Sequence, residues 1–244
     1  MPVDATNASA TDSATNSTAN FGASPAPSAL SSEHGVDLIP GHLHAFALLH
    51  RAMRRDARRL VAAAPSVAAE PGRQAATAAW WDRLRGAIDW HHHSEDEQFW
   101  PELRRRTGVS VDDVLGDDHA GLDRAMAAVS AALATPGGLA DLPLAAARFD
   151  TLVHGHLRRE EAAVFPVLAR VGVRDYLAVE RRLLAAAPRR VLIFVQPWML
   201  EGADPRAVAN VMATVPPPIR LLTGTMRRRY ERLLTAAALP RISA

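Results

Sequence analysis

The 244-residue chain contains no cysteine and no lysine, and aromatic residues make up only 5% of it. Without cysteine it can form no disulfide, thiolate zinc site, iron–sulfur cluster or covalently attached haem. Any metal site must therefore use histidine, aspartate or glutamate. The few aromatic residues and the many alanines favour closely packed helices over a sheet, so we expect an all-α protein.

Long apolar runs and an excess of one charge are also missing. No stretch approaches the ~20 apolar residues that span a bilayer, and the N-terminus lacks the basic and apolar regions of a secretory signal. The 28 basic residues, all arginine, are balanced by 26 acidic ones to give a net charge of +2. An arginine-only basic set is typical of coding bias, so the high pI predicts no nucleic-acid partner. We expect a soluble, cytoplasmic protein without a membrane partner.

The chain divides by composition into three regions. Residues 1–33 are rich in serine, threonine, alanine and asparagine and have almost no large apolar side chains, which predicts a disordered tail. Residues 34–172 carry apolar side chains at helical spacing, and residues 173–244 are expected to form a helical extension that packs on them. Four helices are predicted in the middle region: 36–64, 74–101, 110–134 and 142–170. Their short connections favour an up-down-up-down four-helix bundle.

Proline and glycine set the expected boundaries of these elements. The first helix should stop before Pro65, and the second should kink or tighten at Pro101. In the extension we expect a helix at 175–187, an irregular apolar stretch at 191–200 and a last basic helix at 219–237. Asp204 followed by proline predicts the N-cap of a short helix between them.

One pattern occurs twice in the middle region. His156 and Glu160 are four residues apart and therefore share a helix face, and His91 and Glu95 repeat this spacing with a proline at the same offset. Both pairs continue the apolar stripes of their helices. The stripes of the other two helices also carry one histidine each, His50 and His119.

Two of these choices have alternatives in the sequence. His92 with Asp96, or His93 with Glu97, would give the same spacing as His91 with Glu95. Only the His91 register matches the distance from His156 to Pro166 and extends the apolar stripe, so His92 and His93 are expected beside the ligands or in solvent. In the first helix His42 and His44 compete with His50, and alignment of the two half-repeats supports His50.

Four imidazoles and two carboxylates in the core of a bundle predict a dinuclear metal site. A buried carboxylate without a partner costs several kcal/mol, and no arginine lies on the same stripes. Two adjacent first-row transition metals fit this donor set, with the carboxylates bridging. The predicted ligands are His50, His91, Glu95, His119, His156 and Glu160. A purely structural role for the histidines is the simplest alternative.

The order His, His-x-x-x-Glu, His, His-x-x-x-Glu over residues 37–172 resembles the hemerythrin-like (HHE cation-binding) domain family. Residues 197–218 are similar to C-terminal extensions of some bacterial members. The resemblance implies two iron ions bridged by carboxylate and solvent, with manganese suiting the same ligands, and a small diatomic or peroxide ligand. Oxygen-carrying members have a second histidine one turn after the helix-three ligand, where this chain has Asp123.

The implied function is therefore the binding of O2, peroxide or nitric oxide at a metal pair with open coordination positions. Catalase-like disproportionation of peroxide is one expected activity of such a site. A non-catalytic sensor or store for oxygen, nitric oxide or iron is the alternative.

Overall fold

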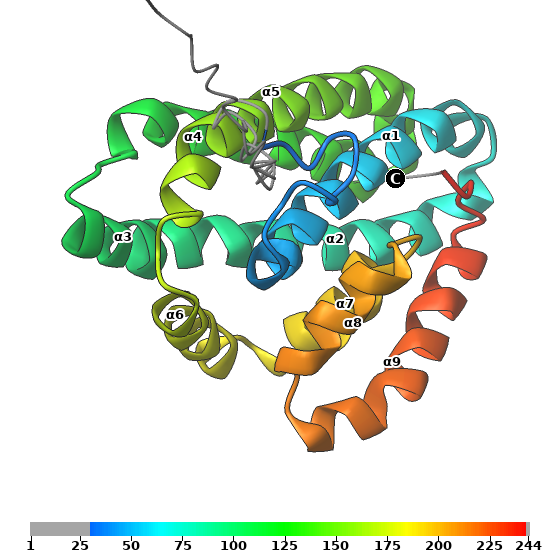
Figure 1. Ribbon diagram of the computed structural model, residues 1–244. Helices are drawn as coiled ribbons and strands as arrows, with labels where there is room; N and C mark the ends of the chain where they lie inside the picture. Colours follow the sequence, from blue (N-terminus) through cyan, green and yellow to red (C-terminus); the bar gives the residue numbers. More distant parts are fainter. Residues whose placement is uncertain (1–29, 243–244) are drawn as a thin grey trace, which may run out of the picture.

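The computed structural model describes residues 30–242, apart from the side chains of residues 112–114, 116 and 117. The described residues form helices joined by short loops and contain no strand, which confirms the all-α prediction. Figure 1 shows the long bundle helices side by side and the C-terminal helices below them. No helix among residues 30–242 combines the length and the hydropathy needed to cross a membrane.

The bundle has the predicted up-down-up-down order. Its second arm is a continuous helical run of three segments, two α-helical and one π-helical. The elements are α1 (His44–Ala69), α2 (Gln74–Ser94), the π-helical segment (Glu95–Phe99), α3 (Trp100–Thr107), α4 (Asp112–Ala134) and α5 (Leu142–Leu168).

The buried apolar side chains fall into two clusters, one on each side of a polar layer. On α1, Leu48 belongs to one cluster and Met53 to the other, with buried His50 between them. On α4, Leu115 and Leu122 flank His119 in the same way. On both helices the buried histidine thus lies at the boundary between the two apolar clusters.

Two prolines do not act as the sequence predicted. Pro65 lies within α1, which continues to Ala69, so the predicted stop at residue 64 is wrong. A proline removes one backbone hydrogen bond, and here its ring is on the exposed face, while Val67 after it is fully buried. Packing of Val67 therefore extends the helix beyond the proline.

The second arm widens near Pro101 where a kink or a tightened end was expected. The backbone N–H of Trp100 donates to the carbonyl of Glu95, five residues earlier, and the arm then continues to Thr107. Pro101, which has no N–H to donate, occupies the first turn of the segment that follows. π-Turns of this kind occur often at functional sites.

The C-terminal extension is helical throughout its main elements. They are α6 (Val173–Ala186), α7 (Arg189–Leu200), α8 (Pro205–Thr214) and α9 (Pro217–Ala236). The expected irregular stretch at 191–200 is wrong, because Val191, Phe194, Val195 and Trp198 form one buried helical face. The N-cap at Asp204 is confirmed, since its carboxylate accepts from the N–H groups of Arg206 and Ala207.

The predicted tail ends earlier than residue 33. Leu30 and Ser32 are buried, and the hydroxyl of Ser31 donates to the Glu161 carboxylate of α5 at 2.9 Å. Residues 30–33 therefore pack on the bundle, held by polar contacts that composition does not reveal. The rest of the predicted tail lies outside the described residues.

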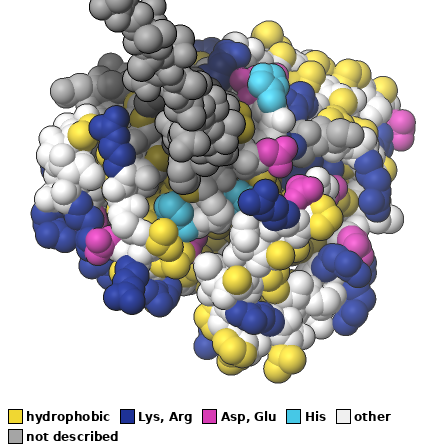
Figure 2. Space-filling model, viewed as in Figure 1, with side chains coloured by type: hydrophobic (Ala, Val, Ile, Leu, Met, Phe, Trp, Pro, Cys, Tyr) yellow, Lys and Arg dark blue, Asp and Glu magenta, His cyan; other side chains and the backbone are white. Residues whose placement is uncertain are grey.

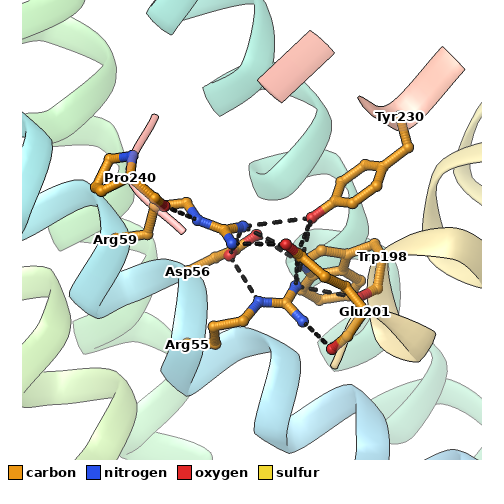
Figure 3. Close-up of polar contacts among 7 residues, drawn as sticks. All are labelled: Arg55, Asp56, Arg59, Trp198, Glu201, Tyr230 and Pro240. Carbon is orange, nitrogen blue, oxygen red and sulfur yellow. Dashed lines mark hydrogen bonds and ion pairs between the residues drawn. The ribbon is translucent and has the colours of Figure 1, made fainter. Parts of the chain in front are cut away.

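The extension is tied to α1 by a buried network of charges (Figure 3). Asp56 accepts a hydrogen bond from the indole N–H of Trp198 at 2.8 Å and pairs with Arg59, whose Nη2 lies 2.8 Å from Glu201. Tyr230 of α9 donates to the same Glu201 at 2.6 Å. Burial opposes charge on Arg59, but Asp56 and Glu201 outweigh it and raise its pKa. Arg59 therefore keeps its charge inside the protein.

Figure 2 shows arginine side chains spread over the visible face, with acidic side chains between them. Hydrophobic side chains gather at the lower end of this face, where α9 begins in Figure 1.

Replacing Asp56 by alanine would leave Arg59 and the Trp198 indole without their buried acceptor. We expect Asp56→Ala to lower the free energy of unfolding by ~3–5 kcal/mol, the usual effect of removing one partner of a buried ion pair. Denaturant unfolding measures this. Asp82→Ala, at an exposed position of α2, is the control and should change stability by less than ~0.5 kcal/mol; equal effects for the two variants would contradict the role of the network.

Candidate metal centre

Seven histidine and glutamate side chains meet in the polar layer between the two apolar cores. Each has at most 7% of its surface exposed. They come from every arm of the bundle: His50 (α1), His91 and His92 (α2), Glu95 (the π-helical segment), His119 (α4), and His156 and Glu160 (α5). All six ligands predicted from the sequence are among them.

The seven side chains form two adjacent groups that could each hold a metal ion. The first contains His50, His91, Glu95 and Glu160, and the second contains His92, His119 and His156. Within each group, one ligating atom per residue lies within 4.8 Å of the others. The imidazole rings of the second group are close together, with centroids 4.3 Å apart for His92 and His119.

Glu160 lies between the two groups. Its Oε1 is 3.5 Å from Nε2 of His50, in the first group, and its Oε2 is 3.2 Å from Nε2 of His156, in the second. One carboxylate therefore presents one oxygen to each group, which is the arrangement of a bridging ligand. Glu95, 3.2 Å from His91, lies on the side of the first group.

The inward atoms of this layer lack hydrogen-bond partners among the described residues. These buried atoms include Nε2 of His50, His91, His119 and His156, both ring nitrogens of His92, and all four carboxylate oxygens of Glu95 and Glu160. Buried polar atoms are normally satisfied, and so many orphans in one place call for an ion. Imidazole and carboxylate donors in this number suit first-row transition metals.

Carboxylates outside the layer orient two of the histidines. Nδ1 of His50 donates to Glu161 at 3.0 Å, and Nδ1 of His119 donates to Asp96 at 3.0 Å. These two hydrogen bonds fix which nitrogen points inward, because a carboxylate can only accept and so places the proton on Nδ1. Nδ1 of His156 faces Asp118 at 3.5 Å.

Glu161 in turn is held by the segment that precedes the bundle. Its carboxylate accepts from Ser31 and Ser32 and from Nη1 of Arg54 at 2.8 Å. Burial opposes its charge, but the hydrogen bonds and charges of His50 and Arg54 lower its pKa far below the usual range. Glu161 was not predicted from the sequence, since a second glutamate after Glu160 carries no signal of its contacts with residues 31 and 32.

The charged groups within the layer shift one another's pKa values. Burial and the neighbouring Glu160 raise the pKa of Glu95 well above its usual value. At Glu160 burial is outweighed by His50 and His156, which lower the pKa. Burial also lowers the pKa of His50, but Glu160 and Glu161 outweigh it and raise the pKa to about 9. Burial and the charge of His50 lower the pKa of His91 to about 3, so its imidazole is neutral.

The structure separates the three registers that the sequence offers, of which the His91 register was the predicted one. His91 and Glu95 are buried in the layer, whereas His93 and Glu97 form a pair on the surface with side chains 71% and 58% exposed. His92 departs from expectation: it is buried and joins His119 and His156, while Asp96 supports His119. The sequence did contain a signal for His92. Position 123 holds aspartate where the oxygen-carrying members of the family have a histidine, and the run His91–His93 offers a substitute.

The remaining histidines lie outside the two groups. His34 is exposed, and His154 accepts from Arg58 at 3.0 Å. His44, expected at the surface or beside a ligand, is instead buried against the extension, where it accepts from Asn210 of α8 at 3.1 Å. His42 is partly buried beside Tyr176, with ring centroids 5.5 Å apart.

A family model described as the hemerythrin HHE cation-binding domain matches residues 42–168, which is more than half of the chain and includes all seven side chains. Comparison with curated proteins and with solved structures gave no significant match.

The Glu161 contacts predict an effect on metal affinity without loss of a direct ligand. Glu161→Ala removes the acceptor that orients His50, and loss of such a supporting carboxylate usually costs ~10–100-fold in metal affinity. Competition with a chromophoric chelator measures this. Glu97→Ala removes a carboxylate that pairs with His93 on the surface, and the metal affinity of this variant should stay unchanged. An equal loss in both variants would refute the role given to Glu161.

Proposed function

Because this chain belongs to the hemerythrin HHE cation-binding domain family, we propose that its polar layer holds two iron ions and binds O2, peroxide or nitric oxide there. The resemblance predicted from the sequence is confirmed over residues 42–168. The observation that carries the proposal is the position of Glu160, whose two oxygens face His50 in one group and His156 in the other.

The histidines divide unequally between the two proposed ions. With Glu160 shared, His92, His119 and His156 would serve one ion, and His50, His91 and Glu95 the other. Each ion would then have four protein ligands, which leaves coordination positions for an external small molecule. In this set His92 would fill the place that Asp123 leaves without a histidine.

Bound iron would supply Lewis acidity and reversible one-electron chemistry to such a ligand. The protein residues provide the surroundings. Phe46 packs on His50 with ring centroids 4.5 Å apart and on Phe165 at 5.8 Å, and it closes the layer on one side with apolar surface. A water-poor layer strengthens the interactions of charges within it and limits hydrolytic side reactions.

Manganese would fit the same donors, because imidazole and carboxylate ligands suit both metals. Iron is proposed on the strength of the family. Metal content of the protein purified from iron- and manganese-supplemented cultures distinguishes the two.

His92 gives a specific test of the ligand set. We expect the wild-type protein to bind two iron equivalents, and His92→Ala to weaken the second by at least about tenfold because it removes one of three imidazoles from one group. Iron content after dialysis against graded chelator measures this. His93→Ala, the neighbouring exposed histidine, should retain both equivalents. Two tightly bound equivalents in His92→Ala would show that six ligands suffice.

Peroxide turnover separates a catalytic from a non-catalytic role. We expect the iron-loaded protein to evolve O2 from hydrogen peroxide, and Glu160→Ala to lose both iron and turnover, since it removes the carboxylate that faces both groups. An oxygen electrode and iron analysis measure the two quantities on the same sample. Glu97→Ala is the matched control and should keep both.

The alternative is a non-catalytic sensor or store. A stable change in the optical spectrum with O2 or nitric oxide, without O2 evolution from peroxide, would favour this alternative over the enzyme. Full turnover in Glu160→Ala would contradict the proposed site itself.

A further inference from the structure

A cavity of about 320 Å³ lies between the bundle and the C-terminal extension. Its walls come from α1 and α2 on one side and from α6, α7, α8 and the start of α9 on the other. Figure 1 shows α6 and the group of α7 and α8 below these bundle helices. We call this cavity the chamber and define it by six of its lining residues: Leu49, Trp90, Leu184, Leu192, Met199 and Ile219.

The chamber wall is almost entirely hydrocarbon. Leu184, Leu192 and Ile219 are only partly covered by the rest of the protein. Burial raises the pKa of Glu180, a further wall residue on α6, to about 7, which fits surroundings poor in water. Large side chains with free apolar surface in a concave site favour an apolar occupant.

The chamber adjoins the polar layer. His91 and Glu95 belong to its wall, and each also has a ligating atom within 4.8 Å of those of His50 and Glu160 in the polar layer. Phe46, which packs on His50, lines it as well. The chamber and the layer are therefore separated by a single thickness of side chains, on the side with fewer histidines.

Size limits what the chamber can hold. A cavity of ~150 Å³ lined by leucine, isoleucine and phenylalanine binds benzene, so one of about twice that volume accommodates roughly a dozen carbon atoms. A helix of a partner protein, ~10 Å across with its side chains, does not fit into this volume. The volume therefore fits a small molecule.

We propose that the chamber binds an uncharged apolar organic molecule of this size and holds it against the wall formed by His91 and Glu95. This goes beyond metal-ligand binding, because the apolar walls need no metal to bind such a molecule. It assigns the extension a specific role: α6 and α7 convert one flank of the bundle into a binding site.

The test uses 1-aminonaphthalene, an uncharged fluorophore with ten ring carbons, titrated into the full-length protein as purified. We expect saturable binding of one equivalent with increased, blue-shifted fluorescence, and displacement by naphthalene or 1-decanol. The two competitors distinguish a flat aromatic from a linear occupant. Iron content is measured on the same samples.

Variants locate the bound probe. Leu192→Trp and Leu184→Trp fill the chamber from two different helices, and each should weaken binding by at least about tenfold, as expected when a hydrophobic pocket loses room for its ligand. Ile193→Trp adds the same side chain at the next position of α7, which is exposed and outside the wall. Its affinity should match the wild type. Cooperative unfolding of each variant confirms that it is folded.

Three results would overturn the proposal: no saturable binding to the wild type, equal binding by Leu192→Trp, Leu184→Trp and Ile193→Trp, or loss of binding in Leu221→Ser. The last would place the probe on the exposed apolar surface of α9, where Leu221 is 86% exposed. Normal iron content without probe binding rejects only the chamber, and probe binding without iron rejects only the metal centre.

Discussion

The desolvation of two carboxylates in the middle of an apolar bundle is the constraint on which the rest of the structure depends. Glu95 and Glu160 are buried between two hydrophobic clusters, where an unpaired charge costs several kcal/mol. The surrounding imidazoles compensate for part of this cost, and cations would compensate for the remainder. If a bound metal satisfies these side chains, metal affinity and folding free energy are linked.

Helix α1 connects the polar layer with the rest of the molecule. His50 faces the layer, and Arg54, one turn later, holds Glu161, which orients His50. Arg55 and Arg59, on another side of the same helix, bind the extension through Glu201. Displacement of α1 would therefore disturb the layer, residues 30–33 and the extension together. The extension is packed as part of the core and not as an appended module.

Helical periodicity was sufficient to predict the bundle and the inward positions of six side chains. Stripes such as Leu84, Ile88, His91 and Glu95 show which face of a helix is buried, and that face determines which polar residues meet. The sequence did not reveal His92. A stripe with one residue per turn includes His91 but leaves out its neighbour His92, whereas in the bundle both side chains point inward. It also missed Glu161, whose partners Ser31 and Ser32 lie some 130 residues away in the chain.

The errors at Pro65 and at 191–200 have a common cause. Local rules predict that a helix stops at proline and that an apolar run without alternating polar residues is irregular. In the structure the burial of Val67 and of Trp198 keeps both segments helical. Nor did local patterns indicate the chamber, since its walls come from six α-helices and its volume depends on how they pack. Boundaries and cavities are tertiary properties, and the sequence reports them only indirectly.

The π-helical turn at Glu95–Phe99 determines how the two halves of the second arm are rotated relative to each other. Each residue of an α-helix advances the chain by about 100° around the axis, and a π-turn accommodates one residue beyond the regular count. Glu95 can thus face the polar layer while Phe99, Trp100 and Leu103 still pack into the apolar cluster beyond it. A shorter, regular helix would turn one of these two sets away from the bundle axis. The additional residue thus adjusts the rotation of the helix, so that Glu95 faces the polar layer and the residues after it face the apolar cluster.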